Sequence, residues 1–188
     1  MTLAEALDER GTLEPAPYWM QPDHHLDAVW SPDPSVDLNA HDGPAWLDDL
    51  GKRARARLAR CRLPSVIGHA DSESQNLRWS GRKLHVAHDW DSLVRRPEAW
   101  VAGMTSLIFP STGSDNEAAT IAESERFLAA YESERGRKFD EEQSEVAWAA
   151  GLWIGAWKAK KALVLAKGGA AVEDLRSQAE ERLYRAGA

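Results

Sequence analysis

Apolar residues recur three or four positions apart along much of this sequence, which is the spacing of an amphipathic helix. The pattern predicts helices over residues 98–109, 116–131 and 172–184. Between residues 140 and 165 the chain is apolar on nearly every side, so we expect that helix to lie inside the molecule. A short helix is also expected over residues 1–10, where Leu3 and Leu7 share one face.

Another helix is predicted before the middle of the chain. Asp42 is expected to cap it, Pro44 to lie in its first turn and Arg60 to stand near its end. Its apolar positions are Leu47, Leu50, Ala54 and Leu58. Arginines gather toward its end and are expected to form a solvent-exposed face that complements the helix dipole: Arg53, Arg55, Arg57 and Arg60.

Capping residues and helix breakers mark the other boundaries. Asp140 and Gln143 have the spacing of a capping box at the start of the apolar helix. Gly168 and Gly169 are expected to end that helix, and residues 110–114 have the composition of a loop. Ser80-Gly81 suits the turn of a small β-hairpin. The fold class predicted is therefore mainly α with one small hairpin.

The first 40 residues differ in composition from the rest. Prolines cluster between residues 14 and 44, so turns are expected there, with at most one short helical piece near residues 24–30. Residues 21–50 contain Asp but neither Lys nor Arg. This run is either a solvated surface or an acidic wall for a cationic substrate, with Trp19, Trp30 and Trp46 as cation–π faces. We divide the chain into an acidic N-terminal segment, 1–40, and a helical lobe, 41–188.

Charge and cysteine content narrow the class of protein. The net charge of −7 argues against nucleic acid as the main partner. No apolar run approaches the roughly 20 residues that span a bilayer, so no membrane partner is expected. Cys61 is the single cysteine and no secretory signal is visible, which together predict a cytoplasmic protein.

The most informative stretch runs from residue 66 to residue 93. It contains His69-Ala70-Asp71, then Asn76, the hairpin around Ser80-Gly81, and His88-Asp89-Trp90. A carboxylate, an amide five residues later and a second carboxylate after a hairpin suit phosphoryl transfer. In that reaction one carboxylate accepts the proton of the attacking hydroxyl. The amide and the other carboxylate supply oxygen ligands to Mg²⁺, which binds the ATP phosphates.

These residues resemble the catalytic core of the aminoglycoside phosphotransferase and choline kinase-like family, whose pattern is His-Gly-Asp-x-x-x-x-Asn followed by Ile-Asp-Trp. His69, Asp71, Asn76, Asp89 and Trp90 fall on that pattern. Ala70 replaces the usual Gly, and His88 replaces a β-branched residue. The match covers about 30 residues with a defined motif, and the resemblance implies the helical C-terminal lobe of a protein kinase-like phosphotransferase over residues 41–188.

The resemblance implies a role for each of these side chains. Asp71 is the candidate catalytic base, and Asn76 with Asp89 would bind ATP through Mg²⁺. His69 is expected to fix the loop by hydrogen bonds, and Trp90 to pack beneath the hairpin. The alternative interpretation is structural, because Asn and Asp both favour turns without any catalytic role.

The nucleotide-covering lobe that kinase-like enzymes place before this stretch is absent. Residues 1–68 contain no glycine-rich strand pair, and the first lysine, Lys52, lies in a predicted helix. We therefore hold two hypotheses. The chain is the catalytic lobe of a phosphotransferase for a small hydroxylated substrate, either cationic or uncharged, acting with ATP and Mg²⁺. Alternatively, it is an inactive or truncated relative that serves as a helical binding or oligomerisation module, as a homo-oligomer or with a separate chain that supplies the missing lobe.

Overall fold

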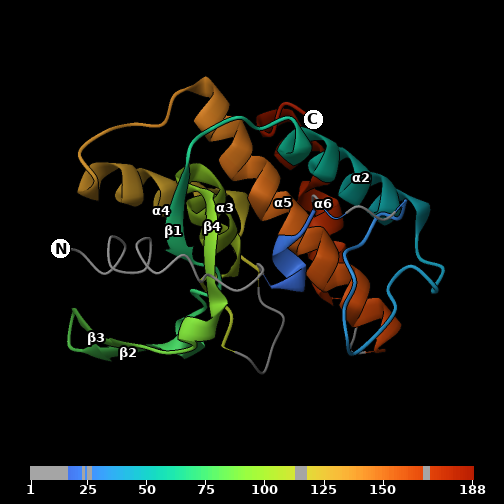
Figure 1. Ribbon diagram of the computed structural model, residues 1–188, viewed down its shortest axis with the longest axis horizontal. Coiled ribbons are helices and arrows are strands. Elements are labelled where there is room, and N and C mark those ends of the chain that lie inside the picture. Colours follow the sequence, from blue (N-terminus) through green and yellow to red (C-terminus); the bar gives the residue numbers. More distant parts are fainter. Residues whose placement is uncertain (1–16, 23, 25–26, 113–117, 167–169) are drawn as a thin grey trace.

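The computed structural model describes residues 17–22, 24, 27–112, 118–166 and 170–188. Within them the protein is mainly helical with two short antiparallel strand pairs (Figure 1). The elements, in chain order, are η1 (Tyr18–Met20), α2 (Ala45–Ala59), β1 (Ser65–His69), η2 (Ser74–Asn76), β2 (Leu77–Ser80), β3 (Lys83–Ala87), η3 (Trp90–Ser92), β4 (Leu93–Pro97), α3 (Glu98–Ile108), α4 (Ile121–Glu134), α5 (Glu141–Val164) and α6 (Ala170–Arg185). The prediction of a mainly α fold with a small hairpin is confirmed.

Helix α5 is the centre of the molecule, and α2, α3 and α6 pack around it (Figure 1). Its apolar residues leave no polar face over most of its length, and Trp153 is fully buried. The predicted capping box is present, because Asp140 Oδ1 accepts from the Gln143 amide at 2.8 Å and Gln143 Oε1 accepts from the Asp140 amide at 3.1 Å. The sequence therefore located this buried helix and its N-cap residue.

Helices α3 and α5 approach each other closely at a pair of glycines. A methyl group added to Gly103 would overlap the backbone carbonyl of Ala147 on α5. On the opposite helix, a methyl group on Gly151 would lie 3.0 Å from the carbonyl oxygen of Gly103. Only a residue without a Cβ permits this separation, and it brings α3 and the chain before it against α5.

Helix α2 buries the predicted face, with Leu47, Leu50, Ala54 and Leu58 all at most 2 % exposed. The prediction of an Asp42 cap is wrong, because Pro44 occupies the cap position and no side chain caps the helix. A proline at this position has no amide to leave unpaired and its fixed φ suits entry into a helix.

Two arginines of α2, Arg55 and Arg57, do not lie on a solvent-exposed face as we predicted. Arg57 is 7 % exposed and pairs with Glu145 on α5 at 2.8 Å. Arg55 donates to the backbone carbonyls of Pro22, His24 and Ala28. These carbonyls lie outside regular secondary structure, so they need a donor from a side chain. The arginines thus attach the N-terminal segment and α5 to α2.

In the Asp-rich run of residues 21–50, the prediction of a solvated surface is confirmed for Asp27, Asp37, Asp42 and Asp49, which are exposed, whereas two other aspartates pair with lysines of α5. Asp33 pairs with Lys161 at 2.6 Å, and Asp48 pairs with the buried Lys160 at 3.1 Å. Both lysines belong to α5. Because this helix is largely buried, their positive charges require counterions. Asp33 and Asp48 therefore provide counterions for lysines of the central helix α5.

The tryptophans expected to form cation–π faces have different environments. Trp30 is 1 % exposed and stacks on Trp153 with ring centroids 5.8 Å apart, so a substrate cannot reach it and that prediction is wrong. Trp46 lies beneath Arg176 of α6, 5.8 Å from its ring centroid. Trp19 lines a cleft.

Several boundaries differ from the sequence prediction. Helix α4 begins at Ile121 rather than at residue 116, because Thr120 and Glu123 form a capping box. In the predicted helical piece near 24–30, residues 27–30 form bends, and the short helix of this region is η1. The predicted helix over 1–10 and the break at Gly168-Gly169 fall outside the described residues. Within the described part of the chain, none of the helices combines the length and apolar character that crossing a bilayer demands.

Candidate active site

The stretch that carries the motif begins and ends on a strand pair that was not predicted. Strand β1 pairs with β4 in antiparallel register, with Gly68 opposite Val94 and His69 opposite Leu93. Gly68 lies against α3, where an added Cβ would come within 2.9 Å of the Val101 side chain. This pairing brings the two ends of residues 65–97 together and fixes His69 and Asp71 beside the helical core.

His69 connects the two halves of this stretch. Its Nδ1 accepts a hydrogen bond from the Asp71 amide at 3.1 Å, and its Nε2 lies 2.8 Å from the backbone carbonyl oxygen of His88. An acceptor at Nδ1 and a donor at Nε2 define the neutral imidazole with its proton on Nε2. His69 therefore occupies the hydrogen-bonding position that the sequence interpretation gave it.

Asp71 and Asn76 are directly bonded. The Asn76 side-chain amide donates to the Asp71 carbonyl oxygen at 2.9 Å and to its carboxylate at 3.0 Å. Asn76 is 7 % exposed, so its orientation is fixed by these bonds. The amide nitrogen faces Asp71, which leaves the side-chain oxygen of Asn76 available to another ligand.

Asp89 lies next to this pair through the backbone of His88. The His88 amide donates to the Asn76 carbonyl oxygen at 2.8 Å, while the His88 carbonyl faces His69. The side chain of His88 is exposed. Asp89 has the left-handed backbone conformation, with φ 59°, which is uncommon for a residue other than glycine. Its carboxylate makes no hydrogen bond or ion pair within the described residues.

Trp90 does not pack beneath the hairpin as predicted. Its side chain is 49 % exposed, its Nε1 donates to the Ala87 carbonyl oxygen at 2.8 Å, and its ring meets the His69 ring edge-on at 5.5 Å. The hairpin of β2 and β3 extends away from the helices (Figure 1), so it offers no interior for a tryptophan. Trp90 supports the site through His69 instead.

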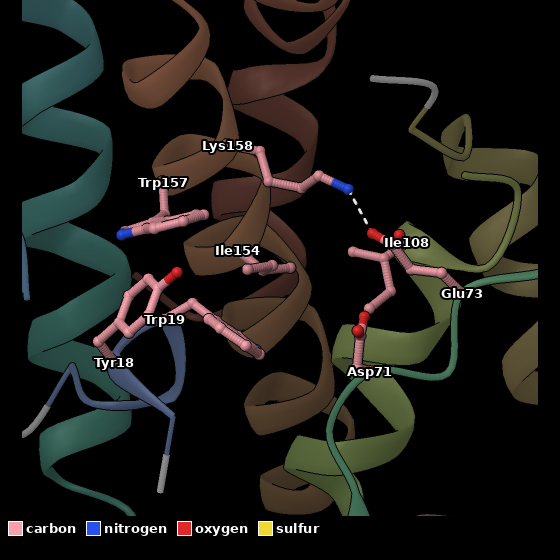
Figure 2. Close-up of a pocket in the computed structure, with 8 residues that line it drawn as sticks. All are labelled: Tyr18, Trp19, Asp71, Glu73, Ile108, Ile154, Trp157 and Lys158. Atoms are coloured by element: carbon pink, nitrogen blue, oxygen red, sulfur yellow. Dashed lines mark hydrogen bonds and ion pairs between the residues drawn. The ribbon is translucent and has the colours of Figure 1, made fainter. Parts of the chain in front are cut away.

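A cleft of about 200 Å³ opens beside Asp71 (Figure 2). It is lined by Tyr18, Trp19, Asp71, Glu73, Ile108, Ile154, Trp157 and Lys158. Figure 2 shows the three aromatic side chains on one side and the two carboxylates on the other. The aromatic side is held in place by α5, because Trp153 Nε1 donates to the Trp19 carbonyl oxygen at 2.9 Å.

Glu73 and Lys158 are the cleft residues that the sequence interpretation missed. Lys158 Nζ lies 2.5 Å from Glu73 Oε1, and the Gln75 amide donates to Glu73 Oε2 at 2.6 Å. Lys158 belongs to α5, where most neighbouring residues are buried. A charged residue at an otherwise apolar position of a buried helix was the available signal, since such a charge requires a partner.

The environment of Asp71 makes it a better base than an ordinary aspartate. Burial, followed by the charge of Glu73, raises the pKa of Asp71, whereas the Asn76 hydrogen bond and the charge of Lys158 oppose the rise. The net direction is upward. A carboxylate with a raised pKa accepts a proton more readily.

The oxygen atoms of Asn76 and Asp89 fit a magnesium ion in type, because Mg²⁺ prefers carboxylate and carbonyl ligands. Among the residues that the structure describes, no three His, Cys, Asp or Glu side chains are grouped to hold a metal by themselves. A metal bound by Asn76 and Asp89 would therefore need further oxygen ligands besides these two side chains.

Comparison of the chain with family models, with curated proteins and with solved structures gives no match.

Proposed function

We propose that this chain is the catalytic lobe of an ATP-dependent phosphotransferase that resembles the aminoglycoside phosphotransferase family and acts on a hydroxyl of a small molecule. The observation that carries the proposal is the arrangement of Asp71, which is bonded to Asn76, aligned by His69 and open to a cleft. A structural turn would need the same hydrogen bonds, but it would not need a carboxylate at a cleft beside aromatic side chains.

The chemistry assigned to the protein is proton transfer and positioning. Asp71 would accept the proton of the acceptor hydroxyl while the hydroxyl oxygen attacks the γ-phosphorus of ATP. ADP would leave with the bridging oxygen. Asn76 and Asp89 would hold Mg²⁺, which neutralises the charge on the phosphates when bound. His69 would keep the Asp71 backbone and the His88-Asp89 backbone in a fixed relation.

The cleft suits an acceptor that carries a positive charge. The rings of Tyr18, Trp19 and Trp157 face the carboxylates, and an ammonium group between them would meet both π faces and a counterion (Figure 2). The protein already places one ammonium against this group of rings, since Lys161 Nζ lies 4.9 Å from the Trp157 ring centroid. The hydroxyl of such an acceptor would then lie near Asp71.

The proposal is tested by titrating the chain with a non-hydrolysable ATP analogue in a calorimeter, with and without Mg²⁺. We expect magnesium-dependent binding that Asp89→Ala abolishes and Ser72→Ala retains. An assay of phosphoryl transfer to amino alcohols should then show activity that Asp71→Asn removes. Absence of nucleotide binding, or equal activity of wild type and Asp71→Asn, would refute the proposal for this chain.

A second function has a specific observation in its favour, namely the exposed apolar side chains of the hairpin. Trp79 and Leu84 form a cross-strand pair and are 52 % and 45 % exposed, and Val86 is 37 % exposed. A two-stranded hairpin is marginally stable in water unless another surface covers it. These residues therefore support the alternative of a binding or oligomerisation module.

The two functions differ in the role of that surface. If the chain is an oligomerisation module, its mass in solution will exceed that of one chain, and Trp79→Ser with Leu84→Ser will return it to one chain. If the chain is a catalytic lobe only, the double substitution will leave the mass unchanged. Light scattering after size-exclusion chromatography measures both outcomes.

A further inference from the structure

We infer that the Glu73–Lys158 ion pair sets how many positive charges the cleft accepts, so that it selects an acceptor with one ammonium group over an acceptor with two. The inference rests on the proposed function and deepens it, because it concerns the acceptor of the same cleft. In this account Lys158 determines specificity and does not take part in catalysis.

The two carboxylates of the cleft differ in what they can still bind. Both oxygens of Glu73 are engaged, one by Lys158 at 2.5 Å and the other by Gln75 at 2.6 Å. The Glu73 side chain is 11 % exposed, so this pairing is sheltered from water. An incoming ammonium group therefore cannot bind Glu73 without displacing an existing partner.

Asp71 is in the opposite condition. Only one of its carboxylate oxygens accepts a side-chain hydrogen bond, from Asn76 at 3.0 Å. Among the described residues, no donor lies within hydrogen-bond distance of the other oxygen. Asp71 is thus the carboxylate that remains open to a ligand. Lys158 occupies Glu73 and prevents Glu73 from binding the ammonium group of a ligand.

The charges that line the cleft lead to the same conclusion. Among the residues that the structure describes, Asp71, Glu73 and Lys158 are the charged residues that line the cleft, and together they carry one net negative charge. Lys161, which lies against Trp157, is itself neutralised by Asp33 at 2.6 Å. A ligand with one positive charge balances the cleft, whereas a second positive charge would lie beside Lys158 without a free counterion.

The experiment compares ligands that differ in charge, in the absence of ATP. Binding of ethanolamine, which carries one ammonium, diaminopropanol, which carries two, and uncharged propanediol is followed by calorimetry near neutral pH. The variants are Lys158→Met, Glu73→Gln and the double variant. Lys158→Arg keeps the charge of the pair, and Lys138→Met removes an exposed lysine outside the cleft.

The wild type is expected to prefer ethanolamine to diaminopropanol, and propanediol is expected not to bind. Lys158→Met frees Glu73 and should shift the ratio of the two dissociation constants toward the diamine by about tenfold, since one unit of charge at short range changes binding several-fold in water and more in a partly buried cleft. The double variant restores the net charge of the wild type and should restore its preference. Lys158→Arg and Lys138→Met should leave the ratio unchanged.

The inference is overturned if the wild type binds neither amine, if Lys158→Met leaves the ratio unchanged, or if the double variant retains the preference of Lys158→Met. If Lys158→Met or Glu73→Gln alone fails to fold, the double variant can still be measured, because it removes both charges of the ion pair together. Failure of the proposed function is a separate result. A chain that selects amines as expected and transfers no phosphate would uphold the ion pair's role and refute the phosphotransferase.

Discussion

The side-chain amide of Asn76 donates hydrogen bonds to both the carbonyl oxygen and the carboxylate of Asp71, at 2.9 and 3.0 Å. Replacing Asn76 by Leu keeps the volume and removes both donors. Asp71 then has a partly buried carbonyl and carboxylate without this partner, which should lower the free energy of unfolding by about 1–3 kcal/mol. Chemical denaturation followed by tryptophan fluorescence measures the change.

Ser72→Ala is the matched control, because Ser72 Oγ makes one hydrogen bond in the same loop, to the His69 carbonyl oxygen at 3.2 Å. It should cost no more than about 1 kcal/mol. Equal losses in the two variants would show that Asn76 does not order this loop.

The close approach of α3 and α5 gives a second prediction. Gly103→Ala should destabilise the protein by about 3 kcal/mol or more, because the new methyl group meets the Ala147 carbonyl and can move away only if two buried helices separate. Thermal unfolding measures the loss. Gly136→Ala is the control: its site has no atom within 4 Å of an added Cβ, and its left-handed φ of 74° should cost about 1 kcal/mol. Comparable losses in both variants would contradict the helix contact.

Sequence patterns predicted those helices whose boundaries depend on local chemistry. The Asp140 capping box and the apolar faces of α2 and α5 are set by neighbouring residues, and they were found. The pairing of β1 with β4 was missed because it joins residues far apart in the chain, and neither strand alternates in polarity. Asp42 was predicted as the cap with Pro44 in the first turn, but Pro44 itself occupies the cap position in the structure.

The candidate site was predicted in part for the same reason. The motif has fixed spacings, so the sequence indicated that Asp71 and Asn76 act together. Glu73 and Lys158 lie on different elements, and their pairing depends on how α5 packs against the loop. Tyr18 and Trp19 also come from a segment whose position follows from bonds to α5, such as that from Trp153. Contacts of this kind leave no periodic pattern in a sequence.

The ion pair of Asp33 and Lys161 predicts how stability depends on pH in acid. Burial alone would raise the pKa of Asp33, but hydrogen bonds from Lys161 and Ser35 and the charge of Lys161 hold it below 3.8. Since the folded pKa is the lower one, the pair contributes stability above pH 3.8, and this contribution is lost as the pH falls through the folded value. Urea denaturation near neutral pH and below pH 3.8 measures the loss.

Asp33→Asn is the test variant for this pair. It should be less stable than the wild type near neutral pH, and the difference should shrink in acid, because the protonated wild-type side chain then resembles the amide. A difference that stays constant across this range would show that the charge of Asp33 does not contribute.

The environment of Tyr131 leads to a prediction of how the stability of the protein depends on pH in alkaline solution. Its hydroxyl donates to Glu98 Oε1 at 2.8 Å, and burial together with this hydrogen bond and the charge of Glu98 raises the pKa of Tyr131 from 10.0 to about 12. The unfolded chain therefore loses the phenolic proton at a lower pH than the folded protein does. Stability that depends on this proton should fall as the pH rises from 10.0 to about 12.

Tyr131→Phe removes the titrating group and should reduce the loss of stability over that interval, although it also removes the hydrogen bond at lower pH. Glu98→Gln keeps the tyrosine and removes the charge, so the phenolate absorbance of Tyr131 should appear at a lower pH than in the wild type. The ultraviolet difference spectrum between wild type and Tyr131→Phe isolates this group from the other tyrosines. If the wild type and Tyr131→Phe lose stability in parallel above pH 10.0, the Glu98 hydrogen bond does not hold the proton on Tyr131.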